Sequence, residues 1–515
     1  MTESRTAKSI RNSVVALIFF VIQFILSFYS RKVFLNYLGE DILGLNTTAT
    51  NILQFLNIAE LGISNAVAFS LYNPLHNNHT KTINEIVTLQ GYLYRRIAVL
   101  IIIGAIIVML FFPLIFKKIT LPLWYAYASF SVLLFSALLG YFINYRQIVL
   151  TASQKDYKIQ YSVGVCNIFK VISQIIALSN FTHPYIWWLI IEVIFTILSC
   201  IVLQIMIHKS FPLLKDVKDS YKTLTTQYAV LIKKTKQVFF HKIGAFTLSQ
   251  SSPLIIYAYS SLSLVALYGN YVLISNGIMR LINAVFNSMG AGIGDLIAEG
   301  NREKIISIFY ELYSIRFYIS AVLAFCLITL GQQFIKVWIG QEYLLALSTL
   351  IIISFTLFIR LNRYTVDQFI AGKGLYQDIW SPIIEACLNI GLSILLGFYF
   401  GLNGILSGVL ISLICVIELW KPYFLFRFGF QEPINNYFKN YLLHLSIASI
   451  VGYVIFQIYK YFWLSIITNW IDFILVSIIV FLSYSLILGL LLYFFSSGYR
   501  CFIKRISCKI KSKLQ

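Results

Sequence analysis

Long apolar stretches recur from one end of the chain to the other, and they constrain the fold more than any other feature of the sequence. Each is about 20 residues or longer, the length that an α-helix needs to cross a hydrocarbon layer roughly 30 Å thick. Of the residues, 59% are hydrophobic and only 12% are charged, against roughly 25% charged in an ordinary soluble domain. The polar breaks are too short for a soluble catalytic domain. The sequence therefore predicts an all-α membrane protein.

The apolar stretches predict about fourteen membrane-spanning helices. The first of them follows Arg5, Lys8 and Arg11 but lacks a small-residue cleavage pattern, so we expect it to be retained as a helix and not removed as a signal peptide. The predicted helices lie near 12–37, 42–73, 87–116, 120–150, 158–180, 184–208, 238–261, 263–292, 305–337, 343–370, 376–400, 402–428, 439–459 and 468–496.

The distribution of basic residues supports this number of helices. Cytoplasmic segments of membrane proteins carry an excess of Lys and Arg. With the N-terminus in the cytoplasm, the segments on the inside hold 31 of the 40 Lys and Arg residues, and those on the outside hold six. A missed helix would place every later loop on the wrong side of the membrane and reverse this excess. The excess therefore supports fourteen helices, and with this even number we predict that both termini are cytoplasmic.

The longest polar break, near 208–237, carries seven lysines and divides the first twelve helices into two sets of six. Residues 38–46 are echoed weakly by 262–270, which suggests a duplicated six-helix unit of the kind that many transporters use. The predicted parts are an N-lobe at 1–208, a basic cytoplasmic linker at 209–237, a C-lobe at 238–428, two further helices at 429–496 and a basic cytoplasmic tail at 497–515.

Several classes of function are disfavoured. The net charge of +20 is spread between membrane segments and does not cluster with aromatic residues, which argues against nucleic acid. The seven cysteines form no C-x-x-C pair, and five of them lie in apolar stretches, so neither disulfides nor a metal site are expected. No P-loop or H-E-x-x-H motif is present. We expect no enzyme, no metal and no bound cofactor.

The predicted helix 42–73 carries a polar face. At 100° per residue, its polar side chains fall within about 40° of one line, opposite an apolar side. A carboxylate in hydrocarbon is costly, so Glu60 must be protonated, paired or exposed to an aqueous cavity. It would be a proton or cation site, a partner of a cationic residue, or a structural interhelical hydrogen-bond partner. The residues of this face are Asn46, Thr50, Asn57, Glu60 and Ser64.

Basic residues inside other helices are further candidates. Arg280, aligned with Asn276 and Asn283, lies near the middle of its helix, where it would line a cavity or form a buried pair. Lys170 has a structural role or faces a cavity. Arg31 points into an outward half-cavity or reaches the outer headgroups.

Three arginines, Arg316, Arg360 and Arg363, lie nearer the predicted cytoplasmic ends and are interpreted as anchors. Glu192, Asp367 and Glu385 are candidate ion-pair partners, although no spacing assigns them.

Segments of the first two helices resemble a known family. Residues 30–46 read SRKVFLNYLGEDILGLN, residues 51–64 read NILQFLNIAELGIS, and the runs SLYNPL at 70–75 and AGKGLY at 371–376 fit the same group. The sequence resembles the polysaccharide transporters, the O-antigen (Wzx-type) and capsular repeat-unit flippases of the multidrug/oligosaccharidyl-lipid/polysaccharide (MOP) exporter superfamily. The resemblance implies two six-helix, MATE-like lobes around a cavity that opens alternately to each side.

The resemblance also implies a cargo, a location and partners. The cargo would be an undecaprenyl-pyrophosphate-linked oligosaccharide, moved to the outer face of a bacterial inner membrane for polysaccharide biosynthesis, beside a polymerase and chain-length machinery. Such a cargo needs cations, amides and hydroxyls in place of water. Arg31, Lys170 and Arg280 would bind the pyrophosphate. Glu60 would couple transport to H⁺ or Na⁺. The sugar-binding candidates are Asn46, Asn57, Asn276 and Asn283.

Two other functions stay open. An ion-coupled drug or cation antiporter of the same superfamily would use Glu60 as its coupling carboxylate. A membrane-embedded polysaccharide polymerase or ligase would need a large outward loop for its catalytic residues, and every outward break predicted here is short.

Overall fold

The computed structural model describes residues 5–514 apart from 61, 118–120, 287–288, 376, 379 and 465. The side chains of residues 5–10, 59, 234, 236–249, 285, 289–291 and 509–514 lie outside the description. The described residues form helices and turns and contain no strand. The chain divides into two compact units, Met1–Ala266 and Leu267–Gln515, called unit 1 and unit 2 below.

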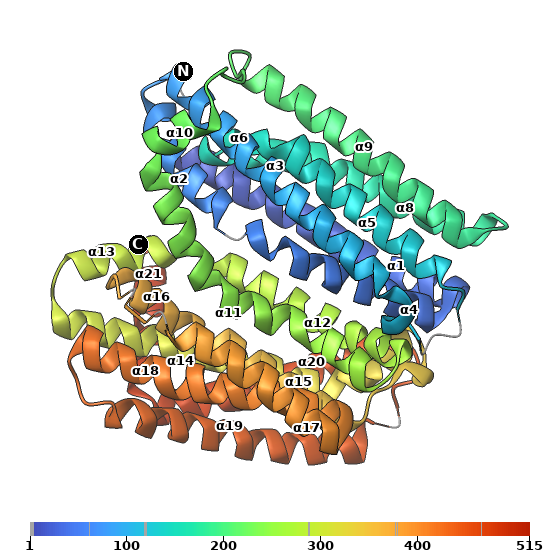
Figure 1. Ribbon diagram of the computed structural model, residues 1–515. Coiled ribbons are helices and arrows are strands. Elements are labelled where there is room, and N and C mark those ends of the chain that lie inside the picture. The colour runs from blue at the N-terminus through green and yellow to red at the C-terminus, as the bar shows by residue number, and fades with distance from the viewer. Residues whose placement is uncertain are drawn as a thin grey trace. The chain divides into compact units, whose positions relative to one another are not determined.

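Unit 1 is a bundle in which α8 and α9 pack against each other, and α1 packs against both α5 and α8 (Figure 1). Its elements are α1 (Arg5–Leu56), the 3₁₀ turn η1 (Asn57–Glu60), α2 (Ile63–His76), α3 (Thr80–Leu110), α4 (Phe112–Ile115), α5 (Trp124–Phe142), η2 (Asn144–Gln147), α6 (Ile148–Ala152), α7 (Asp156–Ile159), the π-helical η3 (Gln160–Gly164), α8 (Val165–Asn180), α9 (Pro184–Ser210), α10 (Tyr221–Gln227), α11 (Ala229–Tyr259) and the start of α12 (Leu262–Phe286).

Unit 2 contains the rest of α12 and the helices that follow. In it α15 packs between α14 and α17, and α19 packs against α20 (Figure 1). Its elements are α13 (Met289–Ala298), α14 (Arg302–Trp338), η4 (Gln341–Tyr343), α15 (Leu347–Asn362), α16 (Tyr364–Gly372), α17 (Trp380–Leu413), the π-helical η5 (Ile414–Trp420), α18 (Lys421–Phe424), the π-helical η6 (Leu425–Phe430), α19 (Asn435–Phe462), α20 (Trp470–Phe495) and α21 (Ser497–Leu514).

Two of the longest helices are each divided by a kink. Gly39 in α1 has φ 80° and ψ 175°, a conformation that side chains with a Cβ rarely adopt. Gly401 in α17 has φ 54°. Both kinks coincide with predicted helix boundaries, after residue 37 and between residues 400 and 402. Each long helix therefore contains parts of two of the predicted membrane spans.

Eleven helical segments in the described part of the chain are long and apolar enough to cross a membrane. Two of these, Arg11–Leu56 and Trp380–Phe430, contain the kinks at Gly39 and Gly401. The helix α11 (Ala229–Tyr259) covers all but the last two residues of the predicted span 238–261. All fourteen predicted helices thus have a counterpart among the described helices, and the chain is a multi-pass, all-helical membrane protein.

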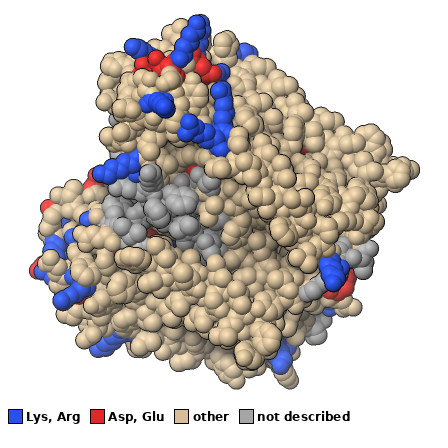
Figure 2. Space-filling model, viewed as in Figure 1, with Lys and Arg blue, Asp and Glu red and all other residues tan. Residues whose placement is uncertain are grey.

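The surface agrees with a membrane environment. Many large apolar side chains are exposed on the long helices, among them Leu110 (74%), Phe398 (74%) and Ile471 (71%). On the visible face, charged side chains gather near the helix ends, and wide areas between them carry no charge (Figure 2). Lipid tails can cover such areas at no hydrophobic cost.

The two halves of α17 pack closely through a pair of glycines. Gly404 and Gly408 are four residues apart, the small-xxx-small spacing that lets membrane helices approach each other. A methyl group on Gly404 would overlap the carbonyl oxygen of Leu396, and one on Gly408 would overlap the backbone of Ser393. The Ser393 hydroxyl donates to the Ile405 carbonyl at 2.9 Å across the same contact.

Gly408→Ala should therefore destabilise unit 2, because the added methyl group has backbone as its neighbour. We expect a loss of about 1–3 kcal/mol, typical of overpacking, measured by thermal unfolding of the purified protein in nanodiscs. Gly391→Ala is the matched control, since it lies in the same helix with nothing within 4 Å of the added Cβ. Equal melting temperatures for the two variants would contradict the close packing of these helix halves.

Candidate functional site

The polar face predicted on helix 42–73 lies where that helix is broken. The α1 helix ends at Leu56, η1 covers Asn57–Glu60, and α2 begins only after Gly62, whose φ is 99°. The prediction of one continuous helix over 42–73 is therefore wrong here. Gly62 provides the left-handed backbone that a break of this kind requires. Broken helices at membrane depth occur where they are buried in protein or line a water-filled cavity.

Glu60 lies in this break and accepts hydrogen bonds from hydroxyl groups. Tyr94 of α3 donates to Oε1 at 2.8 Å, and Tyr141 of α5 donates to Oε2 at 3.0 Å. Ser64 of α2 lies 3.3 Å from Oε1 and 2.6 Å from the Tyr94 hydroxyl. Tyr141 also lies 3.1 Å from Oδ1 of Asn57. Asn57 and Glu60, two of the predicted site residues, are thus brought together.

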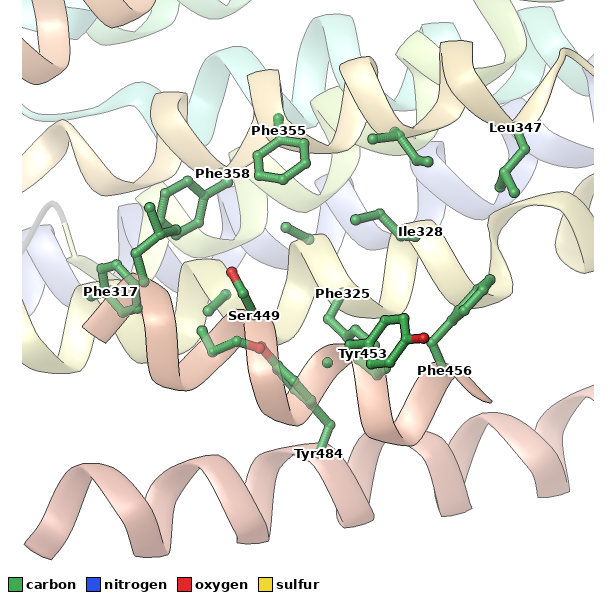
Figure 3. Close-up of a pocket in the computed structure, with 16 residues that line it drawn as sticks. Phe317, Phe325, Ile328, Leu347, Phe355, Phe358, Ser449, Tyr453, Phe456 and Tyr484 are labelled. Carbon is green, nitrogen blue, oxygen red and sulfur yellow. The ribbon is translucent and has the colours of Figure 1, made fainter. Parts of the chain in front are cut away.

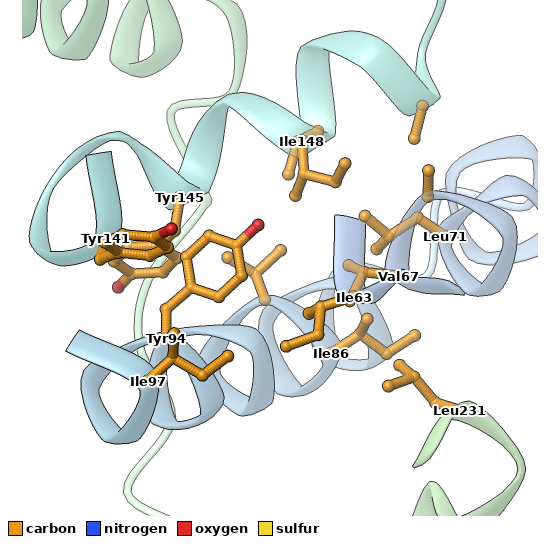
Figure 4. Close-up of a cluster of buried hydrophobic side chains, with 14 of the residues drawn as sticks. Ile63, Val67, Leu71, Ile86, Tyr94, Ile97, Tyr141, Tyr145, Ile148 and Leu231 are labelled. Carbon is orange, nitrogen blue, oxygen red and sulfur yellow. The ribbon is translucent and has the colours of Figure 1, made fainter. Parts of the chain in front are cut away.

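These residues line a polar cavity of about 400 Å³. The side chain of Gln90 on α3 reaches the cavity wall, is 1% exposed, and its Oε1 has no hydrogen-bond partner among the described residues. The rings of Tyr94, Tyr141 and Tyr145 lie together at one side of the apolar cluster that packs α2, α3, η2 and α6 (Figure 4). The cavity therefore lies at the edge of the core of unit 1.

The chemistry of this cavity suits a small cation. Within the described part of the chain, no Lys or Arg forms an ion pair with Glu60. Its negative charge is stabilised by hydroxyl donors, which do not neutralise it. The carboxylate, the free Oε1 of Gln90 and the oxygen of Asn57 are all acceptors, and a proton or a monovalent cation would satisfy them.

A segment that follows α9 is hydrogen-bonded to α3, the helix that carries Gln90 and Tyr94. We call residues 213–219 the strap. Asn84 of α3 accepts from the backbone N–H of Lys215 at 3.2 Å and donates to the carbonyl of Leu213 at 3.1 Å. One turn further along α3, Thr88 accepts from the N–H of Val217 at 3.0 Å. The strap therefore follows α3 along its length.

The strap also reaches the wall of the cavity. Asp216 accepts from the Tyr145 hydroxyl at 3.3 Å and from Arg146 at 2.7 Å. Tyr145 lines the cavity around Glu60. The strap falls in the predicted basic linker 209–237, so in the structure part of that linker is bound to unit 1.

The structure does not place Asn46 beside Glu60. Asn46 is 8% exposed, and its Oδ1 accepts from Ser129 of α5 and, at 3.1 Å, from Tyr185 of α9. The single polar line drawn through Asn46 and Glu60 assumed an unbroken helix. Because η1 interrupts the helix after Leu56, these two residues belong to separate hydrogen-bond groups.

Two predicted basic residues have protein partners in unit 1. Lys170 of α8 donates to Glu192 of α9 at 2.8 Å, and Gln174 donates to the other oxygen of Glu192 at 3.0 Å. The structure thus assigns Glu192 as the partner of Lys170. Arg31 donates to the carbonyl oxygen of Ala266 at 3.1 Å. A structural pair accounts for Lys170 without any substrate.

The predicted residues of α12 differ in their surroundings. Arg280 is exposed, and its guanidinium has no hydrogen bond or ion pair among the residues described. Asn276 is partly buried. Asn283 accepts from Arg316 of α14 at 2.8 Å. Arg280 is therefore the predicted basic residue that is available to a ligand.

Arg316 is not the anchor that its position in the sequence suggested. It is fully buried, donates to the Leu361 carbonyl at 2.7 Å, and lies over the rings of Phe286 and Tyr364 at 4.4 and 4.9 Å. Cation–π contacts and amide oxygens replace water around its charge. Arg363, another predicted anchor, donates to Asp367 at 2.8 Å and is likewise held in a protein network.

Sequence reasoning missed Gln90, Tyr94 and Tyr141, which complete the site around Glu60. Gln90 and Tyr94 are four residues apart in α3, so they share one helix face. That spacing was a usable signal. The sequence carries no signal that marks Tyr141, because tyrosines are common throughout this chain. Only the packing of α5 brings its hydroxyl to Glu60.

The Lys170–Glu192 pair gives a test of its own. Lys170→Met would leave the mostly buried carboxylate of Glu192 without its cation. We therefore expect the free energy of unfolding to fall by about 2–4 kcal/mol. Adding Glu192→Gln should recover most of that loss, because the unpaired charge disappears. A Lys170→Met variant of unchanged stability would contradict a structural pair and would return Lys170 to the set of ligand-binding candidates.

No protein-family profile matches the chain. A sequence from Yersinia pseudotuberculosis named "Putative O-antigen export protein" is 21% identical over 240 residues, which cover 43% of this chain and 54% of that protein. The chain thus aligns with about half the length of this relative.

Solved structures match over much more of the chain. The lipid II flippase MurJ in an inward closed conformation has a TM-score of 0.63 at 16% identity, and the match covers 94% of this chain and 99% of MurJ. A MATE family multidrug resistance transporter of the MOP superfamily, in an inward-facing conformation, has a TM-score of 0.58 at 14% identity over 81% of this chain and 98% of that one. These named proteins are transport or export proteins, not enzymes. The chain therefore has the fold that MurJ shares with this MATE transporter, which confirms the predicted all-helical, MATE-like fold.

Proposed function

We propose that this chain is a flippase that moves undecaprenyl-pyrophosphate-linked oligosaccharide units to the outer face of a bacterial inner membrane, by alternating access. The observation that carries the proposal is a polar cavity around a membrane-embedded carboxylate, in a chain whose fold matches a lipid flippase over 94% of its length. The match to the MATE transporter covers 81%. The Yersinia protein, by its name, concerns O-antigen export.

The chemistry of such a cargo fits the polar residues of the chain. A pyrophosphate and its sugars would lose their hydration in hydrocarbon, so the protein must supply charged and neutral donors. Arg280 is exposed and without a described protein partner, which suits it to bind the pyrophosphate. Arg31 already donates to a backbone carbonyl and could contribute a second cation. Asn276 would bind sugar hydroxyls.

Glu60 would supply the coupling to an ion gradient. With H⁺ or Na⁺ bound, the carboxylate is neutralised and its demand for hydroxyl donors falls. The hydrogen bonds from Tyr94 and Tyr141 join α3 and α5 to the break between α1 and α2. Loading and release of the ion would therefore change how these four helices hold together, which is what an alternating-access cycle requires.

The proposal includes a location and partners. Both termini and the strap would be in the cytoplasm of a bacterium, as the distribution of Lys and Arg indicates. A polysaccharide polymerase and a chain-length regulator would take up the flipped product.

A deletion strain gives the primary test. We expect lipid-linked oligosaccharide to accumulate on the cytoplasmic face, where a membrane-impermeant sugar-modifying enzyme added to intact spheroplasts does not reach it. Complementation with the unaltered gene should restore labelling. Normal labelling in the deletion strain, with no second flippase gene, would overturn the proposal.

Arg280→Gln tests the proposed binding of pyrophosphate. We expect labelling of the flipped product to fall by about tenfold or more, which corresponds to roughly 1.4 kcal/mol of lost interaction. Arg302→Gln is the control, because Arg302 lies at a helix end in an exposed pair with Glu432. Unchanged labelling with normal insertion of the Arg280 variant would remove Arg280 from the site.

Glu60→Gln should abolish coupling while the fold is kept, because glutamine is similar in size and keeps one acceptor oxygen. Transport in reconstituted vesicles should lose its response to an imposed H⁺ or Na⁺ gradient. Tyr141→Phe removes one hydrogen bond to the carboxylate, worth about 1.5–3 kcal/mol, and should weaken the response. Glu299→Gln, an exposed partner of Lys304, is the control. A gradient response that survives Glu60→Gln would show that the coupling site lies elsewhere.

An ion-coupled drug or cation antiporter is the second candidate, favoured by the likeness to the MATE transporter and by the acidic cavity. It differs from the flippase in two measurable respects. Expression of an antiporter would raise tolerance to cationic drugs, and its deletion would leave the delivery of lipid-linked sugars unchanged.

A further inference from the structure

Unit 2 contains a second membrane-embedded carboxylate whose surroundings differ from those of Glu60. Glu418 lies in η5, the π-helical continuation of α17, and is 5% exposed. π-Helical turns are rare and are frequently found at functional sites. None of the sequence features used above singled out Glu418.

Glu418 lies against a cavity of about 490 Å³ between α15, α17, η5 and α19. Apart from Glu418 and Tyr441, the wall of this cavity consists of aliphatic and phenylalanine side chains. Phe355, Phe358 and Leu445 separate it from a second apolar cavity, shown in Figure 3, which extends between α14, α15, α19 and α20. Both cavities offer very little polar solvation to a charge.

The partners of Glu418 leave one of its oxygens free. Tyr441 of α19 and Asn362 at the end of α15 hydrogen-bond to the carboxyl group. Oε1 of Glu418 is buried and has no hydrogen-bond partner among the described residues. A fully ionised carboxylate would need donors at both oxygens in such a place.

The nearest basic residue is already engaged. Arg363 acts electrostatically on Glu418, but its guanidinium donates to Asp367 at 2.8 Å and lies 3.9 Å from Glu385. Lys421 donates to the other oxygen of Asp367 at 2.8 Å. Asp367 and Glu385 therefore balance the charges of Arg363 and Lys421.

The other titratable groups around Glu418 come from three elements. Arg360 of α15 acts electrostatically on Glu385, and Tyr313 of α14 and Tyr437 of α19 interact electrostatically with Glu418. His444, one turn after Tyr441, packs against Phe317 and Tyr313, and neither of its ring nitrogens has a described hydrogen bond.

Arg316 donates to the carbonyl of Leu361, the residue before Asn362, and forms no described ion pair with Glu418. Among these basic residues only Arg363 acts on Glu418, and it is already paired with Asp367.

We propose that Glu418 is a proton-binding site in the membrane part of unit 2, with its carboxyl group protonated at neutral pH and exchanging its proton when water enters the cavity. An ionised carboxylate without a partner is strongly disfavoured in an apolar environment, and protonation removes most of that penalty. The protonated group can accept from Tyr441 and Asn362 through one oxygen. Glu60, by contrast, lies in a polar cavity with hydroxyl donors at both oxygens.

Infrared spectroscopy of the full-length protein in nanodiscs at pH 7 tests this site directly. The carbonyl stretching band of a protonated carboxyl group is separate from the bands of carboxylates. We expect Glu418→Gln to lower the intensity of the protonated-carboxyl band by the contribution of one carboxyl group. Glu432→Gln, at an exposed acid paired with Arg302, should leave the band unchanged.

An unchanged protonated-carboxyl band in Glu418→Gln would overturn the proposal. Should that variant fail to fold, Glu418→Asp serves instead, because it keeps a carboxyl group and should shift the band; a band of unaltered position and intensity would again contradict the assignment. No substrate is needed, so the result stands whether or not the chain moves lipid-linked sugars.

Discussion

A charged or polar group that enters the hydrocarbon core of a membrane must find its partner inside the protein, because no water is there to solvate it. The interior of this chain is organised by that constraint. Lys170 is paired with Glu192, Arg316 lies between aromatic rings and amide oxygens, and Arg363 and Lys421 share Asp367. Each arrangement joins different helices. The polar residues therefore determine which apolar helices become neighbours, a choice that hydrophobicity does not make within a membrane.

Two carboxylates meet the same constraint without an ion pair to any described Lys or Arg, and they do so differently. Glu60 recruits hydroxyl groups from α2, α3 and α5 at a break in its own helix. Glu418 lies in a π-helical stretch, against an apolar cavity and with one oxygen free of a described hydrogen bond. The first arrangement supplies hydroxyl donors to both oxygens of the carboxylate. The second leaves one oxygen without a described donor. Each of the two units thus carries one acidic residue of these two kinds.

The number and limits of the helices could be read from the sequence because both depend on local properties. Apolar length marks each span, and glycine marks the kinks at Gly39 and Gly401. The break at Glu60 was missed because an apolar and polar periodicity continues through residues 57–64, although Gly62 adopts a left-handed conformation. The partners of Glu60 were missed for another reason. Tyr141 lies more than eighty residues away in sequence, and one tyrosine among 34 carries no mark of its contact. Pairing of Lys170 with Glu192 could be suspected but not assigned, since spacing alone does not distinguish among several acids.

The hydrogen bonds of the strap bear on protein engineering, because they limit where a sequence can be inserted between α9 and α11. Its composition is that of an ordinary flexible connection, where an engineer would insert an epitope tag, a fluorescent protein or a protease site. Its backbone is held by Asn84 and Thr88, and Asp216 holds Tyr145 at the wall of the Glu60 cavity. An insertion among residues 213–219 would therefore act at a distance on the acidic site. A tolerated insertion point has to be sought outside these residues.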